Sequence, residues 1–289
     1  MKVLKDAAWK ALGGGIAGAL AMVVQVVALM WMRTTINYQH KNGLTTMGAL
    51  SALYEEGGIA RFYQGFGAAL FQAPLSRFGD TAANAGTIAL LAGVTWLSPA
   101  VKTVCASVAA ALFRIGITPI DALKTSQQVH GAKGTLVLME RIATEGILTL
   151  YSGALGTVVA TFLGHYPWFL TYNYLQAKLP KPQGSVQRNL RSAFIGFMSS
   201  LTSDVVSNSM RVIKTFKQTA DNPISYVGAV SQIIEADGLS GLFLRGLGTK
   251  LLSNGLQAML FTVCWRYFEE QITKWQAAKK GGGKTKKAK

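Results

Sequence analysis

The sequence predicts an all-α membrane protein with six transmembrane helices in three pseudosymmetric repeats, each repeat carrying one short amphipathic helix. Three observations support this fold class. Half of the 289 residues are hydrophobic and only 15% are charged, which is typical of membrane proteins. Six apolar stretches are long enough to cross a bilayer. The same order of long helix, short helix, glycine turn and long helix occurs three times along the chain.

Each of the six stretches holds roughly the 20 residues that a membrane-spanning helix needs. They cover residues 8–38, 66–93, 101–128, 155–178, 188–217 and 247–275. Several are rich in Gly, Ala, Ser and Thr, which lets helices pack closely in lipid. A soluble all-α protein with unusually apolar helices is the alternative interpretation.

The three repeats share a pattern that comes directly after each odd-numbered stretch. A short amphipathic helix ends at an acidic residue and a glycine, and an aromatic or apolar residue followed two positions later by glycine opens the next long helix. The short helices are Leu44–Glu56, Thr135–Glu145 and Tyr226–Asp237. Because glycine adopts left-handed conformations readily, it suits the end of each short helix. The repeats are therefore predicted at 1–97, 98–184 and 185–278, followed by a flexible basic C-terminal tail, 279–289.

The formal charge of +16 comes from Lys and Arg at the ends of the apolar stretches and in the tail. This distribution favours contact with anionic lipid head groups, and we expect no nucleic-acid partner. The two cysteines and three histidines lie far apart, so no metal site or other cofactor is expected. The tail segment Gly281–Thr285 is superficially similar to a phosphate-binding loop, but Ala278 stands where that loop needs glycine. No enzyme motif is present, and we do not expect an enzyme.

One segment at the end of the third stretch resembles a known family. Pro119, Asp121 and Lys124 follow the Pro-x-acid-x-x-base motif of the mitochondrial carrier family, and the threefold plan covers nearly the whole chain. The resemblance implies a multi-pass protein of the mitochondrial inner membrane, with three helix pairs around a central cavity. It also implies that the short helices lie on the matrix side and that both termini face the intermembrane space.

In that family, the acid and base of the motif form ion pairs that close the cavity toward the matrix. When the repeats are aligned on paired small residues in the odd stretches, the first repeat offers Leu29 and Met32, which carry no charge. The charged residues at the equivalent places are Asp121, Lys124, Arg211 and Lys214. The family's pairing rule leaves one opposite-charge pair, Asp121 with Lys214. The matrix gate is therefore expected to be mostly lost.

The family's second gate uses an aromatic residue, an acid and a base near the far ends of the even stretches. The fourth stretch offers an amide version, and the sixth offers charges in reversed order. These residues are Tyr172, Asn173, Gln176, Arg266 and Glu269. This opposite gate is expected to be eroded as well.

Several charged residues inside the stretches could line a substrate cavity. Arg114 and Asp204 each lie five positions before the proline place of their repeat, so both should face the central space. They could bind a small polar solute, or they could pair and lock two helices together. Arg77 and Asp80 could pair along one helix face or line the cavity. His165 could be protonatable in the cavity or hydrogen-bonded to a neighbouring helix.

Two functions remain open. The first is a carrier that moves a small polar solute by alternating access. The second is a carrier fold that has lost transport and serves as a structural subunit of a respiratory or other large membrane complex. Cardiolipin is the expected bound lipid by resemblance, at the turns that open the even helices. The glycines of these turns are Gly65, Gly153 and Gly246.

Overall fold

A computed structural model describes residues 2–91, 93–180 and 184–285, and these residues form helices joined by turns and loops, with no strand among them. It divides into two compact units. One comprises residues 30–254, and the other combines residues 1–29 with residues 255–289.

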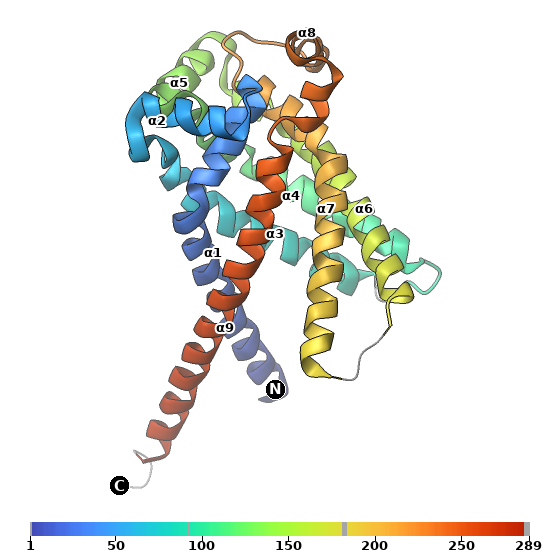
Figure 1. Cartoon of the computed structure of the whole chain (residues 1–289). Helices are drawn as coiled ribbons and strands as arrows, with labels where there is room; N and C mark the ends of the chain where they lie inside the picture. The colour runs from blue at the N-terminus through green and yellow to red at the C-terminus, as the bar shows by residue number, and fades with distance from the viewer. Residues whose placement is uncertain (1, 92, 181–183, 286–289) are drawn as a thin grey trace. The chain divides into compact units, whose positions relative to one another are not determined.

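Six long helices occupy the positions of the predicted spans (Figure 1). Their bounds are α1 Lys2–Asn42, α3 Phe66–Leu90, α4 Pro99–His130, α6 Ala154–Lys178, α7 Ser185–Gln218 and α9 Leu247–Thr285. Proline lies inside α3, α4 and α6, at Pro74, Pro119 and Pro167, where it removes a helical hydrogen bond. The predicted fold class is confirmed for the described residues.

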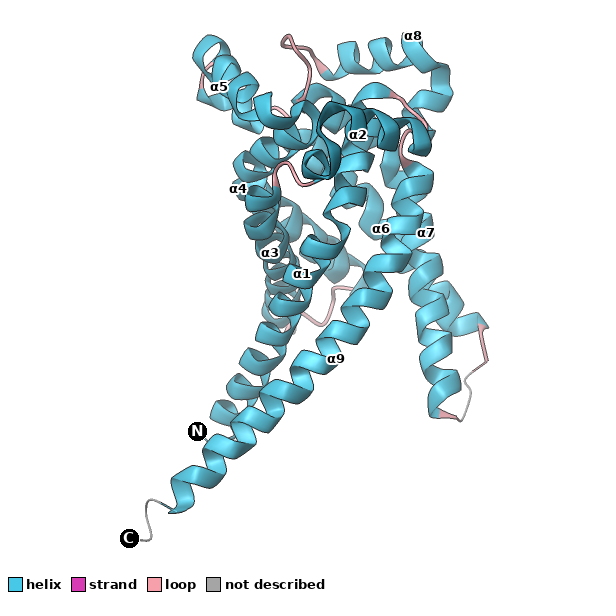
Figure 2. Ribbon diagram, turned by 60° about the vertical axis from the view of Figure 1, so that its left-hand side comes forward, coloured by secondary structure: helices cyan, strands magenta, loops and turns pink. Residues whose placement is uncertain are grey.

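Three shorter helices gather at one end of the 30–254 unit in both views (Figures 1 and 2). They are α2 Thr46–Phe62, α5 Gly134–Glu145 and α8 Tyr226–Leu244. Glycines interrupt or end them as the sequence predicts: Gly58, Gly146 and Gly238 have φ values of 61°, 83° and 67°. Only glycine adopts this backbone region without strain, so each acid–glycine turn redirects the chain toward the next long helix.

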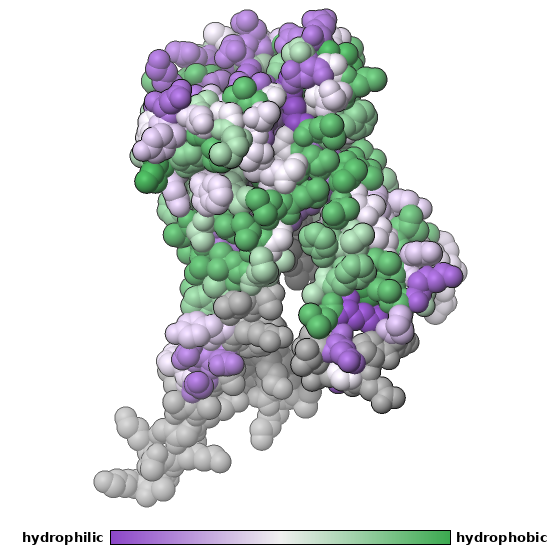
Figure 3. Space-filling view, in the orientation of Figure 1, coloured by the Kyte–Doolittle hydropathy of each residue, from purple (hydrophilic) through white to green (hydrophobic). Residues whose placement is uncertain are grey.

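The flanks of the long helices are apolar enough for lipid. Four segments of the described residues have the length and hydropathy of membrane spans: Leu20–Asn42, Val101–Glu145, Ile147–Lys178 and Tyr226–Leu260. Figure 3 shows a band of hydrophobic side chains below a hydrophilic end. Leu112, Leu170 and Leu190 keep 58–65% of their surface exposed, as expected of residues that contact lipid. Helix α7 is more polar because Asp204, Arg211 and Lys214 lie along it.

In the second unit, the Gln25 side-chain amide of α1 donates to the Gln257 carbonyl of α9 at 2.6 Å. Helix α9 continues to Thr285, into the segment expected to be a flexible tail. The flexibility of the tail stays a prediction. Ala277, Ala278 and the two following lysines are good helix formers, and they carry the helix into the glycines.

Candidate solute-binding site

One carboxylate joins two helices at the predicted matrix gate. Asp121 of α4 accepts a hydrogen bond from the Lys124 ammonium at 2.6 Å and another from the Lys214 ammonium of α7. The three side chains are 13–16% exposed. Lys124 also donates to the Gln72 amide oxygen of α3 at 3.2 Å. The predicted Asp121–Lys214 contact is confirmed, and Lys124 shares the same carboxylate.

A second polar cluster lies around Asp204, which precedes Lys214 on α7 by ten residues, or nearly three turns. The Asp204 carboxylate accepts a hydrogen bond from the Asn254 amide of α9 and lies 3.8 Å from the Arg211 guanidinium. Arg211 also donates to the Ser207 hydroxyl at 3.1 Å. The Asp204 side chain is 8% exposed, whereas Arg211 keeps 36% of its side chain exposed. Arg211 therefore offers an accessible cation beside a buried acid.

Two further cations belong to this region and escaped the sequence interpretation. Lys250 of α9 interacts electrostatically with Arg33, Lys124, Arg211 and Asp204. Lys250 lies one helical turn from Asn254, so both side chains share a face. Arg33 lies directly after Met32, where the first repeat lacks its base. Spacing alone could have indicated Arg33, since it directly follows the aligned position of Met32.

The remaining predicted cavity residues lie in different surroundings. Arg114 interacts electrostatically with Arg211, which places it near the second cluster. The Nδ1 atom of His165 lies 2.9 Å from the Ser107 hydroxyl of α4. His165 thus makes a helix–helix hydrogen bond, in line with the second of its two sequence interpretations. The side chains of Arg77 and Asp80 lie outside the described part of the structure.

Gln176, a residue of the predicted opposite gate, contributes to the contact between α6 and α7. The Gln176 amide donates to the Tyr172 hydroxyl at 3.1 Å, and its oxygen accepts from Arg191 of α7 at 2.6 Å. Arg191 also donates to the Gln176 carbonyl at 2.8 Å. Asn173 is exposed, and the side chains of Arg266 and Glu269 lie outside the described residues.

Three buried arginines donate hydrogen bonds to carbonyl groups at the C-terminal ends of α4, α7 and α1. Arg61 donates to the Gln128 and Val129 carbonyls of α4 at 2.9 and 2.7 Å. Its Nε atom also donates to Glu56 at 2.7 Å. The first two contacts satisfy carbonyls that a helix terminus leaves without intrahelical partners.

The other two arginines do the same for α7 and α1. Arg141 donates to the Gln218 carbonyl at 2.9 Å, and Arg245 donates to the His40 and Lys41 carbonyls at 3.3 and 3.2 Å. Their acidic partners are Glu145 and Asp237. Each arginine thus caps the first long helix of the next repeat. Arg61 of the first repeat caps α4, Arg141 of the second caps α7, and Arg245 of the third caps α1. We refer to Arg61, Arg141 and Arg245 as the capping arginines.

The glycines predicted to bind lipid also permit close helix approach. A Cβ atom at Gly65 would lie 3.0 Å from the Lys124 carbonyl of α4, and one at Gly246 would lie 3.0 Å from the His40 ring of α1. At Gly153 it would overlap the Gln218 side chain of α7. Packing therefore gives a second reason for glycine at each turn.

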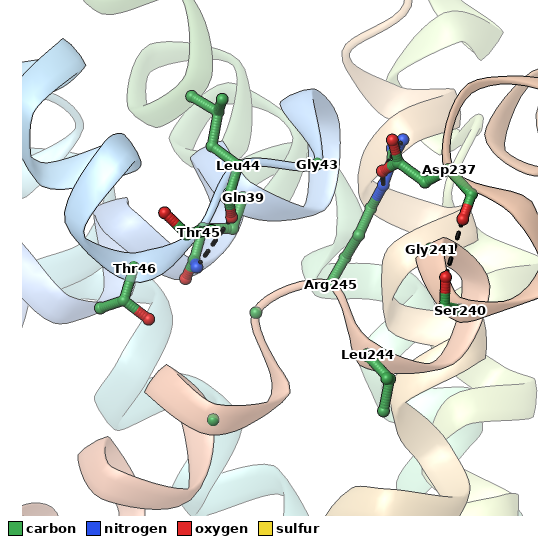
Figure 4. A pocket seen from close by; sticks show the side chains of 12 residues that line it. Gln39, Gly43, Leu44, Thr45, Thr46, Asp237, Ser240, Gly241, Leu244 and Arg245 are labelled. Atoms are coloured by element: carbon green, nitrogen blue, oxygen red, sulfur yellow. Dashed lines mark hydrogen bonds and ion pairs between the residues drawn. The ribbon is translucent and has the colours of Figure 1, made fainter.

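Gly246 lies beside a pocket of about 480 Å³ at the short-helix end (Figure 4). The segment before α2, with Leu44, Thr45 and Thr46, forms one wall, and Arg245 with its partner Asp237 forms the other. The pocket also borders the first residues of α9, including Gly248. Amides at helix N-termini together with an arginine suit a phosphate group.

The chain matches one family model over more than half of its length. The model is described as mitochondrial carrier protein and matches residues 95–183 and 185–275. Mitochondrial RNA-splicing protein MRS4 of Saccharomyces cerevisiae is 25% identical over 132 residues, 43% of each chain. The mitochondrial arginine transporter BAC2 of Arabidopsis thaliana is 29% identical over 140 residues, 46% of each chain. The aligned segments thus span less than half of each relative.

The family match, the membrane-length helices and the paired charges at the end of α4 and α7 agree with one another. The chain therefore belongs to the mitochondrial carrier family.

Proposed function

We propose that the chain is a carrier of the mitochondrial inner membrane that moves a small polar solute by alternating access. The observation that carries this proposal is the pair of polar clusters on membrane-length helices, one at Asp121 and one at Asp204. Charged groups inside a membrane protein are costly and normally serve a cavity or a partner. The accessible Arg211 side chain supports the cavity interpretation.

Flux into liposomes tests this function. The purified chain should move at least one labelled solute from a panel of amino acids, carboxylates and phosphates faster than empty liposomes do. Arg114→Ala should abolish that flux and keep the elution volume of the folded protein. Lys274→Gln is the matched control, because Lys274 is an exposed residue near the end of α9. If no member of the panel moves, the carrier proposal is wrong.

The structural-subunit alternative rests on a different observation. Met32 occupies the basic gate position of the first repeat and is only 1% exposed, so apolar packing has replaced an ion pair there. A chain without transport would be expected to co-migrate with a respiratory or ATP-synthase complex in mild detergent. Migration as a lone monomer, together with solute flux, would exclude this alternative.

Cardiolipin is the lipid that we propose for the pocket beside Gly246. Its two phosphates could meet the amides at the start of α9 and the Arg245 side chain. Cardiolipin should raise the melting temperature of the detergent-solubilised chain. Gly248→Leu should remove this increase, because Gly248 borders the pocket and has open space around its Cβ position. Gly255→Leu is the control, since Gly255 has similar space and lies outside the pocket.

A further inference from the structure

An exposed apolar side chain follows each of the three acid–glycine turns. Ile59, Ile147 and Leu239 come directly after the glycines of these turns and keep 72%, 63% and 66% of their surface exposed. A single exposed apolar residue is ordinary, but one at the same place in three repeats indicates a common cause. We refer to Ile59, Ile147 and Leu239 as the turn residues.

The capping arginines hold these turns in place. The acid of each turn forms an ion pair with one of them: Glu56 with Arg61 at 2.7 Å, Glu145 with Arg141 at 2.9 Å, and Asp237 with Arg245 at 2.8 Å. The glycine that follows turns the backbone at positive φ. The exposure of the turn residues is therefore a consequence of a fixed backbone conformation.

The exposed apolar surface extends from the turns into the even helices. The membrane-length segment Ile147–Lys178 begins at a turn residue, and the segment Tyr226–Leu260 includes another. Beyond the turns, Phe71 of α3, Leu155 of α6 and Leu252 of α9 keep 59–72% of their surface exposed. The turn residues are thus the outermost members of the apolar surface that runs along the even helices.

The turn backbone limits how deep the turns can lie in a bilayer. Gly58, Gly146 and Gly238 have non-helical backbone angles. The hydrocarbon core accepts only backbone groups that are hydrogen-bonded within the protein. A non-helical turn therefore suits the head-group layer, where water and lipid head groups can bind its backbone groups. From that level, an Ile or Leu side chain reaches the acyl chains while the neighbouring acid stays in the polar layer.

The three turns face different sides of the 30–254 unit. The capping arginines join each repeat to the next in a closed ring, so equivalent residues point in different directions around it. The three short helices stand apart at their end of the unit (Figures 1 and 2). A protein partner on one side would cover one or two of the turn residues, whereas a bilayer meets all three at one level. The repetition therefore favours lipid over a protein partner.

We propose that Ile59, Ile147 and Leu239 insert into the acyl-chain layer of the leaflet at the short-helix end and set the level at which this end meets the bilayer. The partner is the acyl-chain region of the bilayer, so this surface differs from the pocket beside Gly246, which suits a phosphate group. The inference goes beyond the proposed transport, because a carrier and a structural subunit would both use these contacts.

Spin-label accessibility in liposomes tests the assignment. The native cysteines are first removed by Cys105→Ser and Cys264→Ser. One nitroxide label per protein is then attached at a turn residue, through Ile59→Cys, Ile147→Cys or Leu239→Cys. The matched controls carry the label at exposed polar residues that precede the turns on the same short helices, through Glu55→Cys, Thr144→Cys or Glu235→Cys. Oxygen concentrates among acyl chains and a nickel chelate stays in water, so the ratio of their collision rates reports depth.

The liposomes contain the chain as their only protein. The ratio of oxygen to nickel collisions should be several-fold higher at all three turn residues than at their controls. Because all six positions are exposed, the labels leave the packed interior intact, and an unchanged elution volume verifies the fold of each labelled protein. Equal ratios at turn residues and controls would overturn the proposal and leave this surface to a protein partner. A high ratio at only one or two turn residues would overturn it as well, since a bilayer must meet all three.

Discussion

The capping arginines give a prediction whose size follows from their contacts. Arg61→Gln removes the donors that serve the Gln128 and Val129 carbonyls, and the Arg61 side chain is only 4% exposed. Hydrogen bonds from a charged donor contribute about 1.5–3 kcal/mol each. Loss of both contacts should lower the free energy of unfolding by about 3–6 kcal/mol.

The acidic partner of Arg61 provides the internal comparison. Glu56→Gln leaves both carbonyl contacts in place, and Glu56 is 42% exposed, so its ion pair is screened by solvent. That change should cost about 1 kcal/mol or less. Arg61→Lys should fall between the two, because an ammonium cannot reproduce the forked geometry of guanidinium.

Reversible unfolding in mixed micelles with increasing dodecyl sulfate, followed by tryptophan fluorescence, measures these differences. The expected order of stability is wild type, Glu56→Gln, Arg61→Lys and Arg61→Gln. If Glu56→Gln costs as much as Arg61→Gln, the ion pair and not the carbonyl cap stabilises this junction, and the reasoning is refuted.

Two further changes can be measured in the same unfolding assay. Asp121→Asn should lower the free energy of unfolding by about 3–5 kcal/mol, because it leaves Lys124 and Lys214 together without their shared carboxylate. The control is Asp221→Asn, which should lower it by less than about 1 kcal/mol because the Asp221 side chain is 79% exposed. Equal losses would contradict this view of the gate. Gly153→Ala should cost about 1–3 kcal/mol because its methyl group would overlap Gln218. Gly67→Ala, with open space at the Cβ position, is the matched control, and a neutral Gly153→Ala would show that the turn adapts.

The spans were predictable because their signals are local. Long apolar stretches and acid–glycine turns depend on residues close together in the chain, and the helices α4, α6 and α7 begin and end within a few residues of the predicted bounds. The Asp121–Lys214 contact followed from the resemblance to a family with known pairing.

The capping arginines could not be found by aligning the repeats. Arg61 lies five residues after its acid, Arg141 four before and Arg245 eight after. Three unrelated sequence positions thus reach equivalent places in space. A repeat alignment compares sequence positions and does not consider how far a side chain extends. Arginine side chains are long and flexible, so arginines at non-equivalent positions can make equivalent contacts without a periodic pattern in the sequence.

One more test concerns the acidic position that the third repeat has lost, where Arg211 stands. Arg211→Asp exchanges a cation for an acid, whereas Arg211→Gln removes the cation alone. If the charge at this position selects the solute, the ratio of anion uptake to arginine uptake in liposomes should fall in the order wild type, Arg211→Gln, Arg211→Asp. Both variants lose the Arg211 contacts to Ser207 and Asp204, so the difference between them isolates charge from packing. An unchanged ratio across all three proteins would mean that shape, and not charge, decides which solute the site accepts.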